Sequence, residues 1–155
     1  NLDLVELVRG CVEQAELEAQ ARHVQLRLTS SGAPVIVFSS ASLLERALDN
    51  LIGNAIKFSA EGGEVEVLVR VADGYTGVSI RDRGPGVPEA ELESLFRPFF
   101  RGSNAVRADG HGLGLAIVQR VVKIHGGALR AANRDGGGLD VDLRLPLAPA
   151  TMAEM

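Results

Sequence analysis

The chain has 155 residues, a length typical of one domain, and a formal net charge of −4 at pH 7. This charge balance provides no basic surface of the kind that nucleic-acid binding requires. The one cysteine, Cys11, excludes a disulfide framework and suits a reducing compartment. No apolar run approaches the ~18 residues of a membrane span, and no signal-peptide pattern is present. We therefore expect a cytoplasmic domain that contacts neither nucleic acid nor membrane, cut from a longer protein.

Hydrophobic periodicity predicts helices and strands in mixed order along the chain. Asp3 is the predicted N-cap of the first helix, and Ser40 or Ser42 that of the second. Asp73-Gly74 and residues 135–138 predict the turns of two hairpins. The expected helices cover residues 3–20, 40–59 and 113–124, and the expected strands 24–28, 35–38, 64–71, 77–81, 128–132 and 139–145. This order predicts an α+β fold, a two-layer sandwich in which helices cover one face of a mixed, mostly antiparallel sheet.

The second predicted helix carries an unusual polar stripe made of Asn50, Asn54 and Lys57. At ~100° per residue these three side chains fall within about 60° of one another, beside an apolar stripe. Asn has poorer helix propensity than Glu, Lys or Arg, so its presence calls for a reason. Amide oxygens are hard ligands for Mg²⁺, and a lysine suits the phosphates that accompany it. Two incidental surface amides are the alternative.

A glycine-dense loop leads into the third predicted helix, in the run from Gly110 through His111, Gly112 and Leu113 to Gly114. Glycines let backbone N–H groups face an anion, and a helix start adds the positive end of the helix dipole. The spacing fits neither the dinucleotide fingerprint nor a P-loop. The loop therefore predicts an anion site outside the two commonest nucleotide folds.

Asp82 stands at the end of a predicted strand, in the run Asp82-Arg83-Gly84-Pro85-Gly86. A carboxylate held there, with glycines that remove side-chain bulk, can accept a hydrogen bond from the exocyclic amine of a base. An ordinary Asx turn is the alternative.

The order of these motifs resembles the catalytic ATP-binding domain of bacterial sensor histidine kinases, in the superfamily that includes gyrase, Hsp90 and MutL. The asparagine helix, Asp-x-Gly-x-Gly, the Phe-rich segment 95–102 and Gly-x-Gly-Leu-Gly-Leu follow one another as in that family, and the resemblance covers residues 1–146. It implies that ATP and Mg²⁺ are the cofactors. It also implies a domain over residues 1–147 with a lid at about 97–110, and we expect the terminal residues 148–155 to be frayed.

The resemblance assigns roles to residues of this chain. Asn50 and Asn54 would hold Mg²⁺, Lys57 and Arg101 would contact the phosphates, and Asp82 would bind the adenine amine. Asn50, Lys57 and Arg101 are thus the implied catalytic residues. A packed Phe58 and a solvated Arg101 remain open as alternatives. The implied nucleotide contacts are Asn50, Asn54, Lys57, Phe58, Asp82, Gly84, Gly86, Phe99, Arg101, Gly110, His111, Gly112, Leu113, Gly114 and Leu115.

The phosphoryl acceptor is missing from the sequence. In the resembled family it is a histidine followed by an acidic residue, on an upstream dimerisation domain. His23, His111 and His125 are followed by Val24, Gly112 and Gly126, so none matches. The implied partners are therefore that dimerisation domain of the same protein and a response regulator.

Two other functions stay open. Hydrolytic relatives keep a Glu general base where this chain has Asn50, and an amide cannot take a proton at neutral pH. Asn50 therefore argues against an ATPase of that kind. A nucleotide-binding regulatory module without catalysis is the second alternative, and the full set of motifs argues against it.

Overall fold

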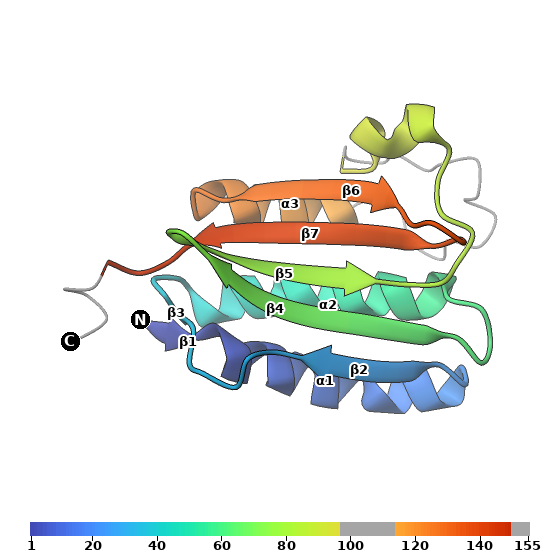
Figure 1. The fold of residues 1–155 in the computed structure, drawn as a ribbon, viewed down its shortest axis with the longest axis horizontal. Helices are drawn as coiled ribbons and strands as arrows, with labels where there is room; N and C mark the ends of the chain where they lie inside the picture. Colours follow the sequence, from blue (N-terminus) through green and yellow to red (C-terminus); the bar gives the residue numbers. More distant parts are fainter. Residues whose placement is uncertain (97–113, 150–155) are drawn as a thin grey trace.

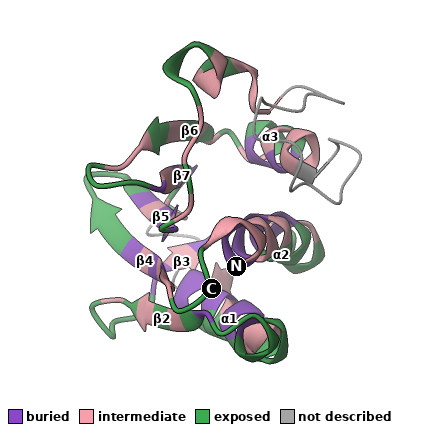
Figure 2. Cartoon of the chain, turned by 90° about the vertical axis from the view of Figure 1, so that its right-hand side faces the viewer, coloured by how far each residue is buried: buried purple, intermediate pink, exposed green. Residues whose placement is uncertain are grey.

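The computed structural model describes residues 1–96 and 114–149 of the chain. Within these ranges, the helices α1 (Leu4–Ala21), α2 (Ala41–Phe58) and α3 (Gly114–Ile124) all lie on one face of a five-stranded sheet, as Figures 1 and 2 show. The expected two-layer α+β sandwich is confirmed. The sheet strands are β2 (Gln25–Thr29), β4 (Glu64–Ala72), β5 (Tyr75–Arg81), β6 (Ala128–Asn133) and β7 (Leu139–Pro146).

The strand order in the sheet is β2-β4-β5-β7-β6. The β4–β5, β5–β7 and β6–β7 pairs are antiparallel, and only the β2–β4 pair at one edge is parallel. Both predicted hairpins, β4–β5 and β6–β7, are therefore present. The pairing of β5 with β7 places the end of β5 against the start of β7, with Arg81 opposite Asp140.

The core lies between the sheet and the helices, and α2 runs through its centre. Leu44, Leu48, Leu51 and Ala55, the predicted apolar stripe of α2, are at most 5% exposed. Burial of such side chains is the main favourable term in folding. With this stripe packed inward, the neighbouring polar stripe necessarily comes to the margin of the core.

Helix caps follow the local sequence signals. The Asp3 side chain accepts hydrogen bonds from the backbone N–H groups of Val5 (3.0 Å) and Val35 (3.1 Å). Ser40, one of the two predicted N-caps, accepts from the N–H of Leu43 at 3.4 Å. The bonds from Val5 and Leu43 each satisfy an amide that the first helical turn leaves without a partner, and the bond from Val35 ties the segment before β3 to the start of α1.

Two short elements, β1 (Leu2–Asp3) and the 3₁₀-helix η1 (Glu89–Ser94), lack a sequence prediction. The strand β1 pairs with β3 (Ile36–Val37), which confirms the strand expected at 35–38, and η1 follows the Asp82 run. Both are too short for a periodic pattern to announce them. None of the described helices is long and apolar enough to cross a membrane.

Candidate functional site

The side chains of Asn50, Asn54 and Lys57 lie along one side of α2 and are half-buried. We call these three residues the polar edge. Asn50 and Asn54 are four residues apart, one turn of the helix, which brings their amides to neighbouring positions on the same face. None of the three side chains makes a hydrogen bond or ion pair with another residue of the described ranges. Two amides held beside a core in this way fit the hard oxygen ligands that Mg²⁺ prefers.

Asp82 follows the last residue of β5 and is only 5% exposed. Its Oδ1 accepts hydrogen bonds from the backbone N–H of Gly84 at 2.8 Å and of Leu139 at 3.1 Å. Its own N–H donates to the carbonyl of Leu139 at 3.0 Å. We call residues 82–87 the Asp82 loop. Its carboxylate is thus held at the margin of the sheet by the first residue of β7.

The bond from Gly84 to Asp82 is an Asx turn, the alternative that the sequence left open for this run. The turn and a binding role are compatible. An ionised carboxylate offers about four acceptor sites on two oxygens, so a carboxylate in an Asx turn can also accept from a ligand amine. The turn orients the Asp82 carboxylate at the end of β5.

The Asp82 loop touches the C-terminal end of α2. A Cβ placed on Gly84 would lie 2.2 Å from the carbonyl oxygen of Phe58, so only glycine allows this approach. The N–H of Arg83 also donates to the hydroxyl of Ser59 at 3.4 Å. The structure therefore brings together the polar edge, the half-buried Phe58 and the loop that carries Asp82, Gly84 and Gly86.

The end of β6 and the β6–β7 turn also contact the Asp82 loop, and the sequence did not predict these contacts. The guanidinium of Arg134, Nη1, donates to the carbonyl of Asp82 at 2.9 Å. A Cβ on Gly138, whose φ is +112°, would lie 2.1 Å from the same oxygen. Asn133 pairs with the backbone of Val87. The glycine run 136–138 predicted a turn, but no local signal shows that the turn meets residues some fifty positions earlier.

Of the remaining predicted contacts, only the start of α3 is described. Gly114 begins α3, and Leu115 is half-buried and packs against the hydrophobic core. Six predicted site residues lie outside the described residues: Phe99, Arg101, Gly110, His111, Gly112 and Leu113.

Neither described histidine has the sequence context of the family's phosphoryl acceptor: His23 is exposed and His125 is half-buried, and neither is followed by an acidic residue. His125 follows α3, and its Nδ1 lies 2.7 Å from the carbonyl of Val121, as expected for a histidine that caps a helix end. Its Nε2 accepts from the N–H of Ser40 at 3.4 Å, which links α3 to the start of α2. His23 occupies the left-handed position after α1, with φ of 57°.

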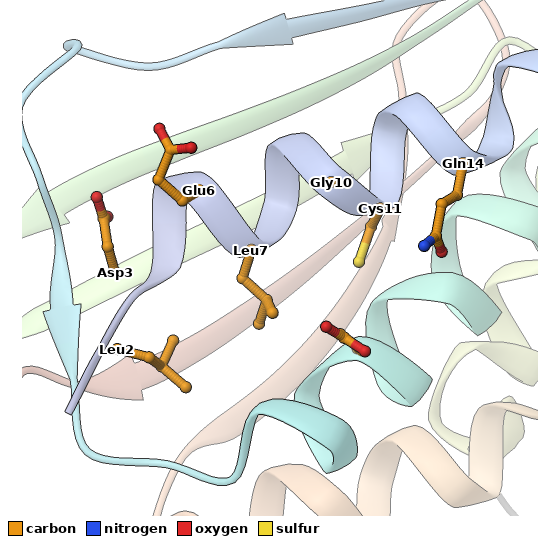
Figure 3. Close-up of a pocket in the computed structure, with 8 residues that line it drawn as sticks. Leu2, Asp3, Glu6, Leu7, Gly10, Cys11 and Gln14 are labelled. Atoms are coloured by element: carbon orange, nitrogen blue, oxygen red, sulfur yellow. The ribbon is translucent and has the colours of Figure 1, made fainter.

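An open groove runs beside the N-terminal half of α1, away from the predicted nucleotide residues. Its lining includes Leu2, Leu7 and Cys11, with acidic side chains such as Glu6 at its margin (Figure 3). Burial raises the pKa of the Cys11 thiol to about 12, and the nearby Asp49 carboxylate adds to this effect. A thiol with so high a pKa is a packed core group rather than a nucleophile.

Within the described ranges, no group of three or more His, Cys, Asp or Glu side chains could hold a metal ion. The amide oxygens of Asn50 and Asn54 could hold a metal ion together with oxygens from a bound ligand. Mg²⁺ suits that arrangement, because it commonly binds through few protein ligands together with substrate phosphates.

Comparisons with known proteins agree with the motif order. The family described as "Histidine kinase-, DNA gyrase B-, and HSP90-like ATPase" matches residues 39–149. The sensor protein CutS of Streptomyces coelicolor is 36% identical over 149 residues, which cover 94% of this chain and 36% of CutS. The chain thus spans about a third of the length of this relative.

Solved structures of histidine kinases share the fold. The mycobacterial sensor histidine kinase MprB has a TM-score of 0.87 and 34% identity, and the match covers 96% of this chain and 98% of that one. Full-length ShkA in complex with AMPPNP has a TM-score of 0.84 and 30% identity over 96% of this chain and 31% of its own. ThkA, solved in complex with the response regulator TrrA, has a TM-score of 0.81 and 25% identity over 96% of this chain and 41% of its own.

Proposed function

Because the chain belongs to the histidine kinase-, DNA gyrase B- and HSP90-like ATPase family, and within it is the ATP-binding catalytic domain of a sensor histidine kinase, we propose that it binds Mg-ATP between α2 and the Asp82 loop. The bound ATP then donates its terminal phosphoryl group to a histidine on another domain of the same protein. One observation carries this proposal. The contact between Gly84 and Phe58 brings the half-buried polar edge of α2 next to the loop that carries the buried Asp82 carboxylate.

Each part of the proposed site has a distinct task. Asp82 accepts a hydrogen bond from the adenine amine, and Gly84 and Gly86 keep side chains out of the space for the base. Phe58 lies at the junction and contacts the nucleotide. Lys57 attracts the phosphates, and Asn50 and Asn54 hold Mg²⁺, which neutralises charge on the transferring phosphoryl group when bound. The nucleotide roles of Gly114 and Leu115 belong to the same proposal.

The residues outside the described ranges complete the proposal through the family pattern alone. Arg101 would contact the terminal phosphate, and residues 97–110 would form a lid over ATP. The lid proposal is tested by hydrogen exchange in this segment with and without a Mg-ATP analogue. Equal exchange rates in the two samples would count against it.

Phosphoryl transfer, and not hydrolysis, fits the chemistry of Asn50. A hydrolytic enzyme needs a group that takes a proton from water, and an amide does not do this at neutral pH. The acceptor would be a histidine of a dimerisation domain, from which a response regulator receives the phosphoryl group. The solved ThkA complex with its response regulator supports such a partner. We place the reaction in the cytoplasm, where ATP is available.

The decisive experiment uses ATP labelled in its terminal phosphate. The chain alone is expected to bind Mg-ATP in calorimetry but to incorporate no label. Addition of the dimerisation domain of its own parent protein is expected to yield acid-labile label on that domain. Label on the isolated chain, or rapid release of inorganic phosphate without an acceptor, would contradict the proposed division of tasks.

A further inference from the structure

Asn133 is the last residue of β6 and lies more than forty positions from the loop that it contacts. Its side-chain Oδ1 accepts a hydrogen bond from the N–H of Val87 at 2.8 Å, and its Nδ2 donates to the carbonyl of Val87 at 2.6 Å. The amide therefore pairs with one residue of the Asp82 loop as a neighbouring strand would. Both bonds are short enough to be well formed.

This pairing has only one chemically consistent orientation. An N–H group requires an acceptor and a carbonyl requires a donor, so Oδ1 must face the nitrogen of Val87 and Nδ2 its oxygen. Nδ2 also donates to the Glu89 carboxylate, Oε1, at 3.2 Å, at the start of η1. An aspartate could supply no donor here, and a serine is too short to reach both groups. The arrangement is specific to the amide of an asparagine.

Gly86 packs closely against the Asn133 amide, beside its pair of bonds to Val87. Its φ is +71°, and a Cβ built on it would lie 2.6 Å from Oδ1 of Asn133. The Asn133 amide and the Gly86 backbone thus occupy adjoining space with no room for a side chain. The position of the distal half of the Asp82 loop is set by this contact.

The two ends of the loop are fixed by different residues. Leu139 and Arg134 hold Asp82, where the loop begins, through its carboxylate and its carbonyl. Asn133 holds Val87, where the loop ends. A loop pinned at both ends keeps its central glycines and its carboxylate in one arrangement, which is the condition for discrimination between bases.

We propose that Asn133 is a positioning residue for adenine recognition, which clamps Val87 and thereby fixes the Asp82 loop in the form that accepts the adenine amine. This inference rests on the proposed function, because it assumes that Asp82 reads the base. Asn133 acts through the loop and does not itself contact the nucleotide.

The test compares ADP with inosine diphosphate, whose base carries an oxygen in place of the adenine amine. Wild-type protein is expected to prefer ADP in calorimetry. In Asn133→Ala the ADP affinity should fall about tenfold, equivalent to ~1.4 kcal/mol, with little change for inosine diphosphate. The preference between the two bases should therefore shrink by the same factor. Arg130→Ala, an exposed position on the same strand, is the matched control and should leave the preference unchanged.

Asn133→Ser is the second variant, in case the alanine variant does not fold, and the same reduced preference is expected. Hydrogen exchange at the Val87 amide provides a measurement on the wild-type protein itself, where the Asn133 bond should slow exchange. Equal losses for both nucleotides in a folded variant, an unchanged preference, or a rapidly exchanging Val87 amide would each overturn the inference. Failure of wild-type protein to bind ADP would instead overturn the proposed function, so the two failures are distinguishable.

Discussion

The Asp82 loop receives hydrogen bonds or close backbone contacts from α2, β6, β7 and the β6–β7 turn, whereas the side chains of the polar edge on α2 bond to no other described residue. The end of the site proposed to read the base is thus built into the fold. The end proposed to hold metal and phosphates presents polar groups on a rigid helix. Changes in the Asp82 loop should therefore lower stability and weaken binding together, and changes in the polar edge should weaken binding without lowering stability.

The strongest test of the loop is Asp82→Ala. We expect about a hundredfold weaker ADP binding, because loss of a hydrogen bond to a buried charged group costs up to ~3 kcal/mol. The melting temperature should also fall, since Gly84 and Leu139 lose their acceptor. Calorimetry and thermal denaturation measure the two effects, and Asp73→Ala, in the exposed β4–β5 turn, is the control.

Asp82→Asn separates the two effects within one residue. Its amide oxygen can still accept from Gly84 and Leu139, so the fold should be retained. An amide NH₂ cannot accept from the adenine amine, so ADP affinity should still fall. Unchanged ADP affinity in this folded variant would remove the adenine assignment.

Gly84→Ala tests the junction between the two ends. A Cβ would lie 2.2 Å from the Phe58 carbonyl, which forces the loop and α2 apart. Overpacking of this kind typically costs about 1 to 3 kcal/mol of stability. We expect a lower free energy of unfolding in urea together with weaker ADP binding. A variant as stable as wild type would show that the close contact does not exist in solution.

The sequence predicted the parts of this site whose signals are local. Periodicity placed the polar edge beside the buried stripe of α2, and the cap residues Asp3 and Ser40 were correctly identified. Asp82 was singled out because it stands in a short run of glycines after a strand, and the structure places it directly after β5. In each case the information lies within one turn of helix or one strand end.

The supports of the Asp82 loop could not be predicted, because they depend on how distant strands pair. The loop is contacted by Asn133, Arg134 and Gly138 because β7 lies between β5 and β6 in the sheet. An asparagine at a strand end and an arginine in a turn look like ordinary surface residues in the sequence. The glycine run similarly predicts a turn without showing that Gly138 abuts the Asp82 carbonyl.

The polar edge is tested by Asn54→Ala. We expect about tenfold weaker binding of Mg-ATP, from the loss of one metal ligand, and no decrease in the free energy of unfolding, because alanine has a higher helix propensity than asparagine. ADP affinity in the absence of Mg²⁺ should stay at the wild-type value. Glu45→Ala, exposed on another side of α2, controls for a general change in charge or helix stability. An equal loss of affinity with and without Mg²⁺ would contradict a metal role for Asn54.

Gly53→Ala gives the smallest expected effect and the sharpest contrast with Gly84→Ala. Gly53 lies on α2 between Asn50 and Asn54, and a Cβ added there meets nothing within 4 Å. Alanine stabilises a helix interior by about 0.5–1 kcal/mol relative to glycine, so the free energy of unfolding should rise slightly. Affinity for Mg-ATP should remain within about twofold of wild type, because the polar side chains keep their positions. Weaker binding in a more stable protein would mean that the nucleotide occupies the space beside Gly53. The nucleotide would then pack closely against the polar edge, as the β6–β7 turn packs closely against the Asp82 loop.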